Sequence, residues 1–248
     1  MKKNTFLCLA TLVLCLCGCS KDNDGEFEEP GKMNDEEFVE PANEEPEFAD
    51  GLGQNPRSAS STQTTLNGVS VTLDGLGFVK WISFGTSGPE SGIDMFSKYL
   101  ELNPNEFYCY RQDKEAGQLS LECYQQKYKG IIVYEGHYGA RFKNGRITDA
   151  NGQYVKIDNL DVTPSFDKQK AMEIFAKYLN VSIDEIYGDH GVMPWFEKEF
   201  LFVKEYPVSK GSSEWAPRLV YGFYGGESAC FIDAHTGRIL ETWSSFID

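Results

Sequence analysis

The 248-residue sequence predicts an α+β fold of two tandem units, each with one helix packed on a roughly four-stranded antiparallel sheet. Three observations lead to this prediction. Aromatic residues are plentiful and lie in alternating runs, which are typical of strands. Short glycine-containing turn sequences separate these runs. The same order of elements, a helix and then four strands, occurs twice between residues 66 and 248.

The first unit, residues 66–160, begins with a predicted helix near Gly92–Leu102. Its apolar residues recur at helical spacing: Ile93, Phe96, Tyr99 and Leu100. Pro104 lies just beyond and favours the end of this helix. The strand-like runs that follow are Phe107–Arg111, Leu119–Tyr128, Ile131–Phe142 and Arg146–Val155. Asn144-Gly145 joins the last two and is the strongest short hairpin signal in the chain.

The second unit, residues 161–248, repeats this order. Its helix is predicted from Ala171, Ile174, Phe175, Tyr178 and Leu179, with Asp167 as the N-cap. The strand-like runs are Glu199–Tyr206, Arg218–Tyr224, Ser228–Asp233 and Arg238–Trp243. A Gly-Arg-Ile sequence stands at the start of the last strand in both units, at residues 145–147 and 237–239.

The N-terminus has the features of an export signal. Lys2 and Lys3 precede an apolar run, Phe6–Leu16, that is too short to span a bilayer. The sequence Leu16-Cys17-Gly18-Cys19 resembles the lipobox of bacterial lipoproteins, in which the cysteine becomes the acylated N-terminus. The resemblance implies that residues 1–18 are a signal peptide and that acyl chains, such as palmitate, anchor Cys19 to a membrane.

Residues 19–65 are predicted to be a disordered tether. Lys21–Asp50 contains thirteen acidic residues and two lysines, and it has three prolines and few aliphatic residues. Such a segment repels itself and cannot bury enough apolar surface to order its backbone. Its acidic start also resembles the signal that sends some lipoproteins to the outer face of the outer membrane, so we expect a surface-facing outer-membrane lipoprotein. Its charge argues against nucleic acid as a partner.

Two stretches carry a further family resemblance. Tyr124–Gly136, with the sequence YQQKYKGIIVYEG, is similar to a stretch of the fungalysin/thermolysin propeptide (FTP) domain, although Ile132 stands where that family usually has proline. Phe231–Leu240, with the sequence FIDAHTGRIL, resembles the closing hairpin of a PepSY domain. The resemblance implies an FTP-like domain at residues 66–160 and a cystatin-like or PepSY-like domain at residues 161–248. It does not place residues 186–195, which look like an insertion.

In that family the two domains precede a secreted zinc peptidase, help it to fold and inhibit it. This chain ends at Asp248, so the resemblance implies a propeptide-like region without its enzyme. The expected function is a non-catalytic binding domain that inhibits a secreted thermolysin-like metallopeptidase or assists its folding. The alternatives are a surface scaffold or ligand-binding module with no peptidase partner and, least favoured, a hydrolase of unrecognised type.

No catalytic constellation supports an enzyme. The three histidines, His137, His190 and His235, do not form the two-histidine pattern of a zinc peptidase. We therefore expect no catalytic, metal or cofactor-binding residues. Gly130 and Gly136 are expected to permit turns or bulges, and Gln126 and Asp233 to bond to backbone groups.

Export permits disulfides. Cys109 and Cys123 lie seven residues either side of Ala116 and are predicted to face each other across a hairpin, which makes them candidates for a disulfide. The alternative is three buried free thiols, with Cys230 as the third.

Overall fold

The computed structural model describes residues 45–188, 192–194, 200–225 and 228–244. The predicted signal peptide, Cys19, His190 and the first part of the tether lie outside these residues. None of the helices in the described ranges is long and apolar enough to cross a bilayer.

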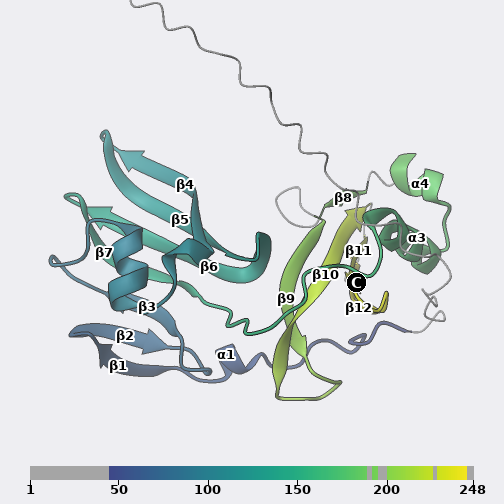
Figure 1. The fold of residues 1–248 in the computed structure, drawn as a ribbon, viewed down its shortest axis with the longest axis horizontal. Coiled ribbons are helices and arrows are strands. Elements are labelled where there is room, and N and C mark those ends of the chain that lie inside the picture. Colours follow the sequence, from purple (N-terminus) through teal and green to yellow (C-terminus); the bar gives the residue numbers. More distant parts are fainter. Residues whose placement is uncertain (1–44, 189–191, 195–199, 226–227, 245–248) are drawn as a thin grey trace, which may run out of the picture. The chain divides into compact units, whose positions relative to one another are not determined.

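The described chain is mostly β-structure (Figure 1). The strands are β1 Thr62–Leu66, β2 Val69–Leu73, β3 Val79–Ser83, β4 Phe107–Glu115, β5 Gln118–Tyr128, β6 Ile131–Lys143, β7 Arg146–Gln153, β8 Met193–Pro194, β9 Leu201–Pro207, β10 Trp215–Gly225, β11 Ser228–Asp233 and β12 Ile239–Ser244. The α-helices are α1 Pro56–Ala59, α2 Gly92–Asp94, α3 Lys168–Leu179 and α4 Ile183–Gly188. A π-helical turn, Met95–Tyr99, continues α2, and a 3-10 turn covers Pro104–Glu106.

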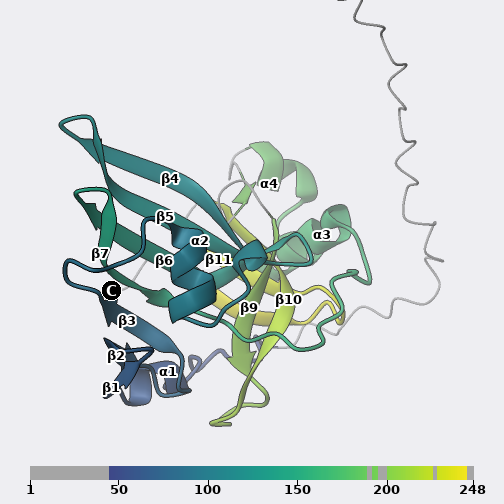
Figure 2. The same cartoon turned by 60° about the vertical axis from the view of Figure 1, so that its left-hand side comes forward.

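All these strands belong to one connected sheet, and β6 is its branch point. The main path runs β1-β2-β3-β7-β6-β9-β10-β11-β12, and the β4–β5 hairpin joins it through β6. Every strand pairing is antiparallel except that of β6 with β9, where Val133 pairs with Val203 in parallel. Figure 2 shows β9 and β10 to the right of the β4–β7 strands.

The prediction of two separate helix-on-sheet units is therefore wrong. The sheet does not stop between the halves, because β6 is thirteen residues long and takes part in both. The first half also has three strands before its helix. That helix is one short α-helical segment and a π-helical turn rather than a packed amphipathic helix.

The π-helical turn changes which residues of this segment are buried. The Leu100 N–H donates to the Met95 carbonyl, five residues back, so each turn is wider than in an α-helix. Phe96 is 1% exposed and Leu100 is buried. Ile93, which the sequence places on the apolar face, is instead 67% exposed.

The β1–β2 hairpin lies partly in the segment that the sequence assigns to the tether. Thr62–Leu66 pairs with Val69–Leu73 across Asn67-Gly68, and both turn residues have positive φ values, as this tight turn requires. The folded part therefore begins before Leu66.

Residues 47–57 also belong to the folded part, and we call them the strap. The Glu47 and Phe48 N–H groups donate to the carbonyls of Ile239 and Leu240, both at 2.9 Å. The Phe48 ring is 3% exposed and stacks on Tyr206 with the ring centroids 5.7 Å apart. The strap thus joins the start of the described chain to its last strand.

The second half has the helix and strands that the sequence predicts. Asp167 caps α3 by accepting a hydrogen bond from the Lys170 N–H, as expected. The buried face of α3 consists of Ala171, Met172, Ile174, Phe175 and Ala176. These side chains belong to one core with residues of β9, β10 and β11, and a separate core lies between β2, β3, the π-helical turn, β6 and β7.

Candidate functional site

The stretch Tyr124–Gly136 builds the branch point of the sheet. Gln125 pairs with His137 and Lys127 pairs with Ile132, so Gln126 alone faces the four residues 133–136. This large bulge separates residues 133–136 from β5 and leaves Val133 available to β9.

Two glutamine side chains bond to backbone groups in and around the bulge. Gln126 is 1% exposed; its Nε2 donates to the Val155 carbonyl at 2.8 Å, and its Oε1 accepts from the Val155 N–H at 3.0 Å. Gln125 Nε2 donates to the carbonyls of Val133 and Gly136. A Cβ at Gly136 would lie 2.2 Å from Gln126 Oε1, so only glycine fits there. These contacts confirm that Gln126 bonds to backbone, and they show that this stretch is structural.

Asp233 has a similar structural role. Its Oδ1 accepts hydrogen bonds from the His235 and Thr236 N–H groups at 3.0 and 2.9 Å, and this arrangement closes the β11–β12 turn. The sequence prediction for Asp233 is therefore also confirmed.

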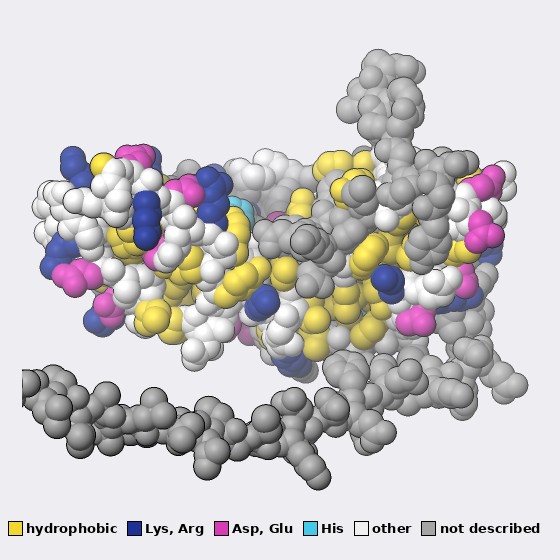
Figure 3. All heavy atoms as spheres, turned by 90° about the horizontal axis from the view of Figure 1, so that it is seen from above, with side chains coloured by type: hydrophobic (Ala, Val, Ile, Leu, Met, Phe, Trp, Pro, Cys, Tyr) yellow, Lys and Arg dark blue, Asp and Glu magenta, His cyan; other side chains and the backbone are white. Residues whose placement is uncertain are grey.

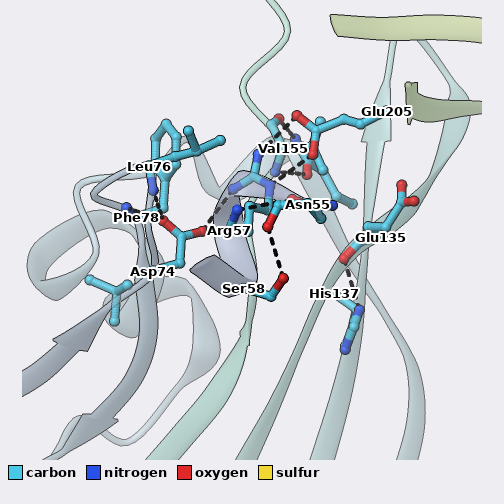
Figure 4. A network of polar contacts seen from close by, with 12 residues as sticks. Asn55, Arg57, Ser58, Asp74, Leu76, Phe78, Glu135, His137, Val155 and Glu205 are labelled. Carbon is cyan, nitrogen blue, oxygen red and sulfur yellow. Dashed lines mark hydrogen bonds and ion pairs between the residues drawn. The ribbon is translucent and has the colours of Figure 1, made fainter. Parts of the chain in front are cut away.

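A buried polar network crosses the branch point (Figure 4). Arg57, in the strap, donates to both carboxylate oxygens of Glu205 at 2.7 and 3.0 Å and to Asp74 Oδ2 at 2.9 Å. All three residues are less than 9% exposed. Burial opposes the charge on Arg57, but the two carboxylates outweigh it and raise its pKa. The network thus ties α1, the β2–β3 turn and β9 together.

Glu135 lies beside this network without a full set of partners. Its Oε2 is buried and has no hydrogen-bond partner among the described residues. Burial raises the pKa of Glu135 to about 7; Lys204 opposes this shift, and the nearby Glu205 adds to it. Figure 4 shows Glu135 on β6 near His137, whose Nδ1 donates to the Glu135 carbonyl.

We expect Glu135 to make the free energy of unfolding fall as the pH rises from about 4.5 to about 7. In the unfolded chain this carboxyl loses its proton near its ordinary pKa of 4.5, whereas the folded chain keeps it up to about pH 7. Stability is therefore lost between these two values, by up to about 3 kcal/mol. Urea unfolding at intervals from pH 4.5 to 8 should give a flatter profile for Glu135→Gln than for the wild type. Parallel profiles would contradict the expectation.

Four strands, β1, β4, β8 and β12, each pair on one side only among the described strands. β8 is only two residues long, and the edges of β4 and β12 are protected. The strap covers part of the β12 edge through Glu47 and Phe48. β4 has two register shifts and a run of charged residues at its exposed end, Arg111, Asp113, Lys114 and Glu115. Bulges and charges are the usual devices that prevent pairing at an edge.

The β1 edge has none of these protections. Thr62–Leu66 contains no charged residue or proline, its register with β2 is unbroken, and its first four residues are exposed. Its free backbone groups can pair with another extended segment. Figure 1 shows β1 as the outermost strand of this end of the sheet.

A cavity of about 240 Å³ lies next to β1. Its lining comes from β1, β2, the β2–β3 turn, β3, the segment after the π-helical turn, β6 and the residue after β7: Thr64, Thr65, Leu66, Leu73, Gly77, Phe78, Val79, Leu100, Glu101, Leu102, Tyr138 and Tyr154. The buried wall is apolar, and the exposed rim carries Thr64, Thr65 and Glu101. An apolar cavity beside an open strand edge is the arrangement that binds extended peptides.

The cysteines do not form the candidate disulfide in this structure. Cys109, Cys123 and Cys230 are all free thiols, of which only Cys230 is buried. The two-residue turn is centred between Ala116 and Gly117, so Cys109 pairs with Tyr124, and Cys123 with Arg111. Partial desolvation raises the pKa of Cys109, and complete burial raises that of Cys230 further. These two thiols are therefore poor nucleophiles.

The remaining candidate residues do not converge on a site. His137 lies on β6 and His235 in the β11–β12 turn. No group of histidine, cysteine and carboxylate side chains within the described residues has the arrangement of a metal site. On the face in Figure 3, basic and acidic side chains are interspersed over the first half, at the left.

The β1 edge and its cavity were not predicted from the sequence. The alternating Thr62–Leu73 stretch around Asn67-Gly68 is a hairpin signal that could have located β1. The cavity has no such signal, because its lining comes from segments far apart in the chain.

Comparison with known proteins yields little similarity. No protein-family model and no curated protein matches the chain. Among solved structures, the Bacillus megaterium YpeB C-terminal domain is similar over 71% of this chain and 75% of its own, with 12% sequence identity and a TM-score of 0.34. A similarity at this level carries no argument about function, and the family of the chain is not established by it.

Proposed function

We propose that this chain is a non-catalytic binding protein that captures an extended segment of a partner protein by adding it to β1. The observation that carries the proposal is the unprotected β1 edge beside an apolar cavity. In strand addition, main-chain hydrogen bonds provide affinity, and a pocket for alternate side chains provides specificity.

The proposal includes a membrane anchor. The lipobox-like Leu16–Cys19 sequence supports acylation of Cys19, and the acidic segment behind it supports display on the outer membrane. Incorporation of a labelled fatty acid into the wild type but not into Cys19→Ala would test the anchor. Equal labelling of both would exclude it.

The favoured partner is a secreted thermolysin-like metallopeptidase, which the chain would inhibit or help to fold. The sequence resemblance of Tyr124–Gly136 and Phe231–Leu240 to FTP and PepSY domains supports this partner. Without a covalent link to the enzyme, the domain lacks the high effective concentration of a propeptide, so affinity must come from the interface itself. The alternative is a surface scaffold or ligand-binding module whose partner is not a peptidase.

The strand-addition test uses a fluorescein-labelled ten-residue peptide of alternating Thr and Val with a central Leu. We expect fluorescence anisotropy to give a Kd in the micromolar range with the mature chain. Thr64→Pro and Thr65→Pro each remove one N–H, and because these groups alternate along a strand, one of them faces the open edge. The variant that keeps its circular dichroism spectrum and melting temperature should lose at least tenfold in affinity.

Gln112→Pro, on the protected edge strand β4, is the matched control and should bind as the wild type does. The proposal would be overturned if the wild type did not bind the peptide. It would also be overturned if both β1 variants bound the peptide as tightly as the wild type. The partner is tested separately by titrating thermolysin, and metallopeptidases secreted by the same cells, with the mature chain. If neither activity nor refolding yield changes, the peptidase role is lost and the scaffold alternative stands.

A further inference from the structure

We infer that the segment captured by β1 carries a large apolar side chain that enters the cavity and, two positions away, a Lys or Arg that faces Glu101. This inference rests on the proposed function, because it assumes an added strand on β1. It specifies the class of sequence that the edge selects.

The pleat of the sheet determines which side chains of an added strand face the cavity. Thr64 pairs with Val71, which is fully buried in the core of the first half, so Thr62, Thr64 and Leu66 share the inner face of β1. Alternate residues of an added strand continue this inner face. They project toward the segment around Glu101, which forms the opposite rim of the cavity.

The cavity exists because β1 places a small polar residue on its inner face. Thr64 does not fill the space in front of Val79, Leu100 and Tyr138, which are less than 8% exposed and belong to the core. The volume of about 240 Å³ is below the range of about 300–1,000 Å³ that is usual for small-molecule sites. It suits one or two apolar side chains better than a cofactor.

The two tyrosine hydroxyls at the cavity need no hydrogen bond from a bound segment. The hydroxyl of Tyr138 donates to the Val79 carbonyl at 2.6 Å, and that of Tyr154 donates to Glu106 at 3.2 Å. Because both hydroxyls already have partners, the space between them favours an apolar guest.

Glu101 adopts an unusual backbone conformation at the rim. Its φ is 56°, in the left-handed region, directly after Leu100, the C-cap of the π-helical turn, where glycine is the ordinary choice. Of the other non-glycine residues with positive φ in the described chain, four begin a two-residue hairpin turn before glycine, and Asn180 caps α3. A strained residue with a charged side chain beside a cavity is the pattern of a functional position.

Asn67 fixes the Glu101 carboxylate. Its Nδ2 donates to Glu101 Oε1 at 3.2 Å and to the Lys98 carbonyl at 3.0 Å. Among the described residues, Oε2 of Glu101 has no hydrogen-bond partner, so it is available to a basic side chain of the captured segment.

The test compares peptides in the host sequence described above. One pair has Leu or Ala at the central position, and a second pair keeps Leu and has Lys or Glu two positions away. For the wild type we expect the Leu peptide to bind about 10- to 100-fold more tightly than the Ala peptide. The Lys peptide should bind at least two- to fivefold more tightly than the Glu peptide, because this ion pair is exposed to solvent.

Two variants separate the two contacts. Glu101→Gln should abolish the preference for Lys over Glu and retain the preference for Leu. Thr64→Leu, which narrows the cavity at an exposed position, should reduce the preference for Leu and retain that for Lys. Binding of all four peptides with equal affinity would overturn this inference and leave the proposed function intact, whereas absence of binding by every peptide would overturn the proposed function itself.

Discussion

Replacement of Arg57 by Ala should lower the free energy of unfolding by about 3–5 kcal/mol. The change removes the cation that pairs with both Asp74 and Glu205, and it leaves two buried carboxylates without a counterion in the described structure. Glu135, whose Oε2 is already unpaired, then lies beside a second uncompensated carboxylate. Urea unfolding of the mature chain at pH 7 measures the loss.

Arg111→Ala is the matched control. Arg111 also pairs with a carboxylate, Asp113, but both side chains are well exposed. Exposed ion pairs contribute about 0–1 kcal/mol, so this variant should differ little from the wild type. Similar losses for Arg57→Ala and Arg111→Ala would show that the buried network does not hold the halves together.

Phe48→Ala should cost about 3–5 kcal/mol, as is typical for a fully buried aromatic residue. Phe48 lies in a cluster with Phe202, Tyr206, Val220 and Leu240, although the sequence assigns it to an unstructured tether. Thermal unfolding should show a clear decrease in the melting temperature. Leu76→Ala, at a position 45% exposed, is the control for the loss of apolar surface in general. A change in melting temperature no larger than that of Leu76→Ala would contradict the docking of the strap.

Local sequence patterns were sufficient to predict the approximate positions of the strands from Phe107 onward, except β8. Glycines with positive φ separate β4 from β5, β5 from β6 and β6 from β7. The N-cap of α3 at Asp167 and the backbone contacts of Gln126 and Asp233 followed from side-chain chemistry alone.

The arrangement of these strands could not be predicted in this way. The assumption of two repeated units hid the role of β6, because its shared use depends on the pairing of Val133 with Val203, seventy residues further along the chain. The geometry of the π-helical turn, which exposes Ile93, is likewise set by packing around Phe96 and not by the spacing of apolar residues.

The strap could not be predicted because the acidic composition of Lys21–Asp50 is that of a disordered segment. Glu45, Glu47 and Asp50 continue the acidic run, yet Glu47 pairs with Arg218, and the Phe48 ring fills a core. The β1 edge could likewise be predicted only in part. The alternation around Asn67-Gly68 is visible in the sequence, but the position of Glu101 opposite β1 depends on tertiary contacts.

The strap also sets the order in which the molecule can fold. Glu47 and Phe48 bond to Ile239 and Leu240, so these contacts cannot form until the chain has been synthesised at least as far as Leu240. The hairpins β1–β2, β4–β5 and β6–β7 close over two-residue turns and can form early, whereas contacts between distant residues carry the larger entropic cost of loop closure. The strap therefore docks last, and the described part of the chain becomes fully cooperative only after β12 has joined the sheet.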